Sequence, residues 1–67
     1  MDKATEVARI EREATEVRLS PVKLAQRAGV NASTWYRNRK NPDTITLDTI
    51  DKLESAIRAK RSEMASA

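Results

Sequence analysis

Residues 24–35 read Leu24-Ala25-Gln26-Arg27-Ala28-Gly29-Val30-Asn31-Ala32-Ser33-Thr34-Trp35, and they predict a short helix, a tight turn and the start of a second helix. Ala25 lies where the two helices would cross, and its small side chain lets their backbones approach. Gly29 follows four residues later and can adopt the left-handed conformation that a short interhelical turn needs. Val30 and Trp35 are then expected to point into the angle between the helices. This spacing is typical of a helix-turn-helix, whose second helix enters the major groove of DNA.

The distribution of charge distinguishes this motif from a plain helical bundle, in which a glycine between two short helices is also common. Between positions 17 and 42 there is no acidic residue, but there are six basic ones: Arg18, Lys23, Arg27, Arg37, Arg39 and Lys40. The other seven basic residues and all ten acidic residues lie outside this segment, so the net charge of +3 understates the local field. A scaffold has no reason to exclude carboxylates over such a length, whereas a surface that faces phosphates does.

The same segment resembles the Cro/repressor helix-turn-helix family of phages and bacteria. The resemblance covers about residues 19–57 and rests on several elements that agree in order, namely Ser20-Pro21-Val22-Lys23-Leu24-Ala25-Gln26-Arg27-Ala28-Gly29-Val30-Asn31, Trp35, Pro42 and Leu47-Asp48-Thr49-Ile50-Asp51-Lys52-Leu53. It implies an all-α, lambda repressor-like domain of four helices, with the helix-turn-helix at about 21–40. The family often has a fifth helix that helps it to dimerise, for which only residues 58–67 remain here.

Four positions depart from the family pattern. Trp35 stands where the family usually has Ile or Val, Asn38 where it has an apolar residue, and Arg39 where it often has Glu. Asn41 replaces the glycine that often ends this helix. These differences predict a second helix that packs less of itself into the core and carries more charge than usual.

Length and composition predict one small domain spanning residues 1–67. A chain of this size buries only about 60% of its unfolded surface, and the sequence has no Cys or His for a disulfide or a zinc site. Few Gly and Pro residues and no strand-like alternation predict an all-α fold. Because no run is apolar enough for a membrane span or a signal segment, we expect a cytoplasmic protein without a membrane partner.

Apolar periodicity and capping residues predict where the first three helices lie. The first covers residues 2–17, with its apolar stripe at Val7, Ile10, Ala14 and Val17. Ser20 and Pro21 begin the second helix as its N-cap and first helical residue. Asn31 caps the third helix by accepting from an N–H near Thr34. That helix must end by Asn41, because the residue before a proline avoids the helical region.

The fourth helix is expected to begin after Thr46 as its cap, with Ile45 and Ile50 spaced as a hydrophobic staple. Its inward stripe is predicted to be Leu47, Ile50, Leu53 and Ile57. Two alternatives remain for the end of the chain. Either the fourth helix is long and pairs with a second copy through Ile57 and Met64, or the tail frays.

With Trp35 turned inward, four residues fall on or beside the outward face of the third helix. The resemblance assigns base contacts to these same positions: Ala32, Ser33, Tyr36 and Arg37. Arg37 can make a bidentate contact to O6 and N7 of guanine, Ser33 can bond several bases, and Ala32 can touch a thymine methyl. Tyr36 can reach a thymine methyl or a phosphate. The alternative is that these are ordinary solvent-facing residues of a short helix.

Contacts to the DNA backbone are expected around this face. Lys23 lies in the first turn of the second helix, where its charge opposes the helix dipole and a phosphate would relieve the conflict; the alternative is an exposed lysine with no role. The polar run Asn38-Arg39-Lys40-Asn41 is interpreted as a cluster that binds phosphates and sets register without reading sequence. The predicted backbone contacts are Ser20, Lys23, Asn31, Thr34, Arg39, Lys40 and Asn41.

The sequence therefore predicts a sequence-specific regulator of transcription that binds double-stranded DNA. One helix reads only a few base pairs, so a homodimer on an inverted repeat is expected. The alternative is an antitoxin-type protein-interaction module whose DNA binding is secondary, although the tail is short for a segment that clamps a toxin. Without His or Cys we find no nucleophile–base or acid–base pair, so no enzyme activity, cofactor, metal or small-molecule substrate is expected.

Overall fold

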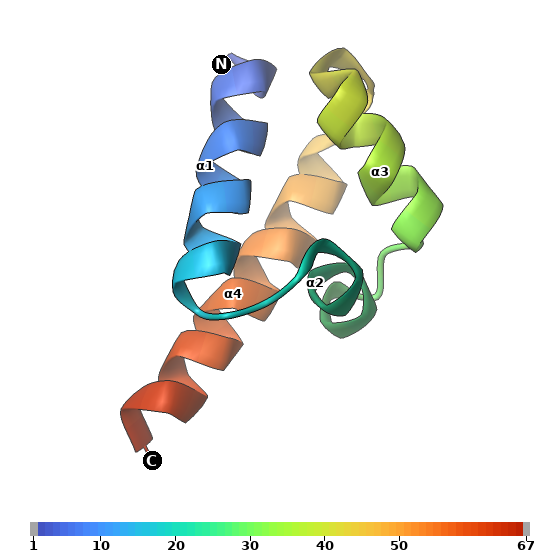
Figure 1. Cartoon of the computed structure of the whole chain (residues 1–67). Coiled ribbons are helices and arrows are strands. Elements are labelled where there is room, and N and C mark those ends of the chain that lie inside the picture. The colour runs from blue at the N-terminus through green and yellow to red at the C-terminus, as the bar shows by residue number, and fades with distance from the viewer. Residues whose placement is uncertain (1, 67) are drawn as a thin grey trace.

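The computed structural model describes residues 2–66, which form four α-helices, one short 3₁₀ helix and no strand. The α-helices are α1 (Lys3–Glu16), α2 (Pro21–Ala28), α3 (Ala32–Lys40) and α4 (Leu47–Ser66), and the 3₁₀ helix η1 (Pro42–Thr44) joins α3 to α4. Figure 1 shows the long helices α1 and α4 packed together, with α2 crossing α4 and α3 facing α1 from the opposite side of the molecule. The all-α fold and the four predicted helices are confirmed.

Side-chain caps begin the helices where the sequence predicts them. The hydroxyl oxygens of Ser20 and Thr46 accept from the backbone N–H three residues further on, at 3.2 and 3.1 Å. The Oδ1 atom of Asn31 accepts from the N–H of Ser33 at 2.9 Å, one residue earlier than the expected partner near Thr34. Each cap satisfies an N–H that the first turn of a helix leaves without an internal partner.

Gly29 closes the turn between α2 and α3 in the predicted left-handed conformation, with φ at 71°. Its N–H donates to the carbonyl of Gln26 at 3.3 Å, and the N–H of Val30 donates to the carbonyl of Ala25 at 2.9 Å. These bonds satisfy two of the last four carbonyls of α2. They also fix the direction in which the chain leaves α2, and therefore the placement of α3.

The hydrophobic core lies between all four helices and includes Trp35, which is buried as predicted. Val30 packs against the core but is only partly buried. The buried core residues are Val7, Ile10, Ala14, Val17, Leu19, Leu24, Ala25, Trp35, Ile45, Ile50, Leu53, Ala56 and Ile57. Because Trp35 and the residues of α2 share this core, the rotation of α3 about its own axis is fixed.

The structure contradicts the prediction that Leu47 belongs to the inward stripe of α4. Its side chain is 62% exposed, whereas Ile45, just before the cap, is buried. Ile45 and Ile50 are both buried, which agrees with the predicted staple and brings the chain into the core ahead of the helix. The first residue of α4 is then carried to the outer side.

Asn38 also differs from its prediction. It was expected in an exposed phosphate-binding cluster, but only 1% of its surface is accessible. Its Nδ2 donates to Oγ1 of Thr44 in η1 at 2.9 Å, while no hydrogen-bond partner reaches its Oδ1 among the described residues. The expectation that α3 packs less of itself into the core is therefore wrong at this position, because η1 covers the amide.

α4 continues to Ser66, so residues 2–66 contain no fifth α-helix and the fourth helix is long, as one of the two alternatives predicts. Its predicted pairing through Ile57 is wrong, because Ile57 is buried in the core, whereas Met64 is exposed. Although α4 has 20 residues, neither it nor any other helix within residues 2–66 is both long and apolar enough to cross a membrane.

Candidate nucleic-acid interface

The outward face of α3 carries the four residues predicted to contact bases. Trp35 and Asn38 hold the inner side of the helix in the core. The helical repeat consequently places the following side chains together in solvent: Ala32, Ser33, Tyr36 and Arg37. All four are exposed, so nothing in the described chain prevents this face from entering a groove.

Ser33 is oriented by the residue that caps α3. Its hydroxyl donates to Oδ1 of Asn31 at 2.6 Å, and its backbone N–H donates to the same oxygen. Because the hydroxyl proton is used within the protein, the Ser33 oxygen is left with lone pairs that can only accept. The matching donors in the major groove are the amino groups of adenine and cytosine. Among the described residues, Nδ2 of Asn31 makes no side-chain hydrogen bond.

Tyr36 and Lys40 form a pair one turn apart on the same face. The Nζ atom of Lys40 lies 5.2 Å from the centroid of the Tyr36 ring, within the range of a cation–π interaction. Both residues remain exposed, so the pair restrains the lysine without removing its charge from solvent. Arg37 has no acidic partner within residues 2–66.

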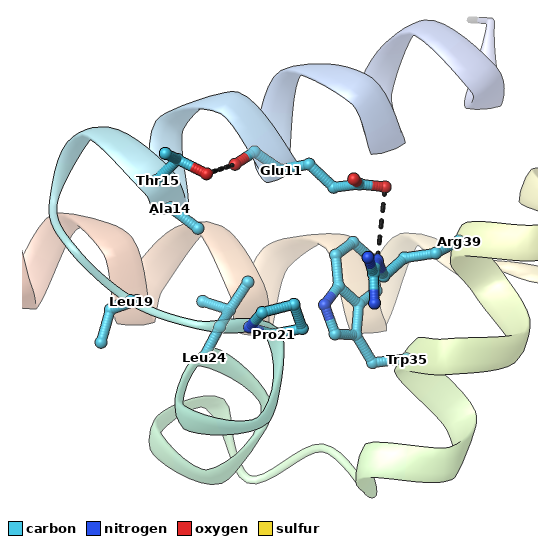
Figure 2. Close-up of a pocket in the computed structure, with 8 residues that line it drawn as sticks. All are labelled: Glu11, Ala14, Thr15, Leu19, Pro21, Leu24, Trp35 and Arg39. Carbon is cyan, nitrogen blue, oxygen red and sulfur yellow. Dashed lines mark hydrogen bonds and ion pairs between the residues drawn. The ribbon is translucent and has the colours of Figure 1, made fainter.

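Arg39 differs from the other predicted contacts because it is held by α1. Its Nε lies 3.5 Å from Oε1 of Glu11, and Figure 2 shows the two side chains reaching toward each other from α1 and α3. The two charges form an ion pair, but the buried Nε–H makes no hydrogen bond within the described chain. The predicted role of Arg39 as a phosphate contact would therefore require it to leave Glu11.

The remaining predicted backbone contacts surround α3. Ser20 and Lys23 are exposed at the start of α2, and Asn41 is exposed at the end of α3. Thr34 is half-buried, on the flank of α3 beyond Arg37. Except for Thr34 and Arg39, the predicted backbone contacts are freely accessible.

Carboxylates from α1 and α4 neutralise part of the basic segment. Glu63 of α4 pairs with Arg27, and Glu11 of α1 pairs with Arg39. Within residues 2–66, four of the six basic residues make no ion pair: Arg18, Lys23, Arg37 and Lys40. Sequence reasoning missed both glutamates, because the partners lie far apart in the chain and no local pattern joins them.

An exposed apolar residue of α2 also escaped the sequence prediction. Val22 lies near Tyr36, and the two help to line a shallow hollow of about 70 Å³ together with Pro21 and Ala32. In the sequence, the signal for it is a β-branched residue in the first turn of the predicted second helix, immediately after Pro21. An apolar surface at the edge of α3 suits contact with a thymine methyl.

The charge network around Arg9 contains none of the predicted contact residues. Nη2 of Arg9 donates to Glu54 at 2.5 Å and to Glu6 at 2.7 Å, while its Nη1 donates to Glu13 at 3.3 Å. These carboxylates, Glu6 most strongly, raise the pKa of the Arg9 guanidinium above its ordinary value. Because Glu54 belongs to α4 and the others to α1, the network fixes one long helix against the other.

No group of three or more acidic residues within residues 2–66 is arranged to hold a metal ion. Comparisons with protein families, curated proteins and solved structures found no match to the chain.

Proposed function

We propose that the protein is a sequence-specific regulator of transcription that binds double-stranded DNA, of the Cro/repressor helix-turn-helix type. The observation that carries this proposal is the exposed face of α3, where Ser33, Tyr36 and Arg37 stand together opposite the buried Trp35. An α-helix fits the major groove of B-DNA, which is about 12 Å wide. The absence of acidic residues between positions 17 and 42 supports the same orientation.

In the proposed complex, α3 lies in the major groove and its first turn reaches the base edges. Ala32 and Ser33 are small, so this end of the helix can approach closely. Arg37 makes the bidentate contact to guanine, and Ser33 accepts from an adenine or cytosine amino group. Ser20 and Lys23 contact the backbone from the start of α2, where N–H groups and a basic side chain both attract phosphate.

We further propose that the protein binds as a homodimer. A single α3 reads only a few base pairs, and each correct pair contributes about 1–3 kcal/mol of discrimination. Two copies related by a two-fold axis would double the sequence that is read. The expected operator is an inverted repeat with its half-sites about 34 Å apart, which is one turn of DNA.

Selection from a pool of random duplexes tests this proposal. The protein is mixed with the pool, bound DNA is recovered and sequenced, and one short motif repeated in inverted orientation is expected. The control is Arg12→Ala, because Arg12 is an exposed arginine of α1 without an ion-pair partner in the described chain. Arg37→Ala should change the selected motif, whereas Arg12→Ala should leave it unchanged. Recovery of no preferred sequence would contradict the proposal.

The mass of the complex on the selected duplex tests the dimer separately. Two chains per duplex are expected by light scattering coupled to size-exclusion chromatography. One chain bound to one asymmetric site would disprove the dimer and leave the DNA-binding proposal intact.

A further inference from the structure

The hollow beside the C-terminal end of α3 contains charges of both signs. It has a volume of about 360 Å³, opens to solvent, and is lined by Tyr36, Lys40, Arg39 and Glu11. The first three residues come from α3 and belong to the predicted DNA-binding surface. Glu11 comes from α1 and is the one carboxylate in the group.

We infer that Glu11 competes with a DNA phosphate for Arg39, and so lowers the affinity of the protein for DNA of every sequence. This inference rests on the proposed DNA binding. In the free protein the carboxylate occupies the cation, and in the complex a phosphate oxygen replaces it. Glu11 is thus a positioning residue that acts on DNA only through Arg39.

The geometry of the ion pair makes such an exchange easy. Nε of Arg39 is buried and lies 3.5 Å from Oε1 of Glu11 without a hydrogen bond, whereas the two side chains as a whole are 32% and 42% exposed. Ion pairs between side chains this accessible to water are weak. A phosphate can offer the same guanidinium two parallel charge-assisted hydrogen bonds, which are stronger than the contact they replace. Lys40 lines the same hollow and would help to hold the phosphate there.

Glu11 nevertheless weakens the phosphate contact, because its own interaction with Arg39 must first be broken. This cost does not depend on the base sequence, because phosphates repeat along every duplex. Glu11 therefore sets the level of sequence-independent binding and leaves the preference of α3 for particular bases unchanged.

The test replaces Glu11 by its neutral isostere. Glu11→Gln should strengthen binding to random duplex and to selected duplex by the same factor, about two- to fivefold near 0.1 M salt, as expected from loss of one exposed ion pair. The slope of log affinity against log salt should change by much less than one, because Arg39 neutralises the same phosphate in both proteins. Fluorescence anisotropy of labelled duplexes at four salt concentrations measures both quantities.

Glu16→Gln is the matched control. It makes the same chemical change on the same helix, but Glu16 pairs at 3.8 Å with Arg61 of α4, outside the basic segment. It should raise the affinity less than Glu11→Gln does. The second control is Arg39→Gln, in whose background Glu11→Gln should have no further effect. Thermal unfolding of each variant checks that the fold is retained.

Two results would overturn the inference. One is an equal gain from Glu11→Gln and Glu16→Gln, which would reflect net charge alone. The other is a gain that persists in the Arg39→Gln background, since Glu11 would then act on DNA directly. Failure of the proposed function is a different result, because in that case the wild-type protein binds no duplex even at low salt.

Discussion

Arg18 and Gly29 occupy equivalent positions at the ends of α1 and α2. Both residues have a left-handed backbone conformation, with φ at 61° and 71°. In each case the next residue donates its N–H to the carbonyl five residues earlier, at 2.8 Å after α1 and 2.9 Å after α2. This is the helix-ending turn that favours glycine, because a Cβ atom in the left-handed region meets the neighbouring carbonyl. At the end of α1, this left-handed position is occupied by Arg18 in place of glycine.

Arg18→Gly should therefore stabilise the protein, by about 1 kcal/mol, because it relieves the left-handed strain. Arg18→Ala keeps the Cβ atom and should give no comparable gain. The reciprocal change, Gly29→Ala, should destabilise by about the same amount, through the local backbone alone, because an added Cβ would meet no atom within 4 Å beyond the adjacent residues. Urea unfolding monitored by circular dichroism measures all three. Equal stability of Arg18→Gly and Arg18→Ala would mean that the strain is absent.

The buried amide of Asn38 leads to a prediction about Thr44. Thr44→Val removes the acceptor of Nδ2 and should reduce stability by about 1–3 kcal/mol, because a buried donor is left unpaired. Asn38→Leu removes that donor together with the unpartnered Oδ1, so it should be neutral or stabilising. Thr44→Val should then matter less in the Asn38→Leu background, which a double-mutant cycle in urea measures. A large loss from Asn38→Leu alone would indicate that the amide stabilises the fold in another way.

Substitutions at Trp35 and its neighbour Tyr36 should distinguish a loss of folding stability from a loss of DNA affinity. Trp35→Ala removes the largest buried side chain and should destabilise by about 3–5 kcal/mol. That is close to the whole stability of so small a domain, so Trp35→Phe provides a milder variant that can still be measured. Tyr36→Ala should change the unfolding temperature little and reduce DNA affinity instead. If Trp35→Phe left the unfolding temperature unchanged and weakened only DNA binding, the burial of Trp35 would not be what holds α3.

Features set by neighbouring residues could be predicted from the sequence. A cap and its partner lie two or three residues apart, as Ser20 and Asn31 show. The turn at Gly29 depends only on the left-handed backbone conformation of that residue. The burial of Trp35 follows from its spacing to Gly29. For the same reason, the exposed face of α3 could be assigned before its surroundings were known.

Features set by distant segments could not be predicted in this way. Leu47 and Ile45 are both apolar, and only the path of the chain from η1 into α4 decides which of them is buried. The polar side chain of Asn38 is covered by η1. A helical wheel cannot predict this burial, because η1 lies outside the helix. The pairing of Glu11 with Arg39 depends likewise on how α1 packs beside α3.

Arg37 and Lys40 test whether α3 reads sequence. Arg37→Ala should reduce affinity for the selected duplex by about 1–3 kcal/mol and relax the preference at one base position in each half-site, because it removes a contact to a base edge. Lys40→Ala should weaken binding to selected and scrambled duplexes equally, and lower the slope of log affinity against log salt by about one for each phosphate contact that is lost. The difference arises because a base edge differs between sequences and a phosphate does not. Titrations of both duplexes at three or more salt concentrations separate the two effects, with Arg12→Ala as the control for lost charge. Should Arg37→Ala behave like Lys40→Ala on both duplexes, Arg37 contacts only the backbone, and any reading of sequence must rest on Ser33 and Tyr36.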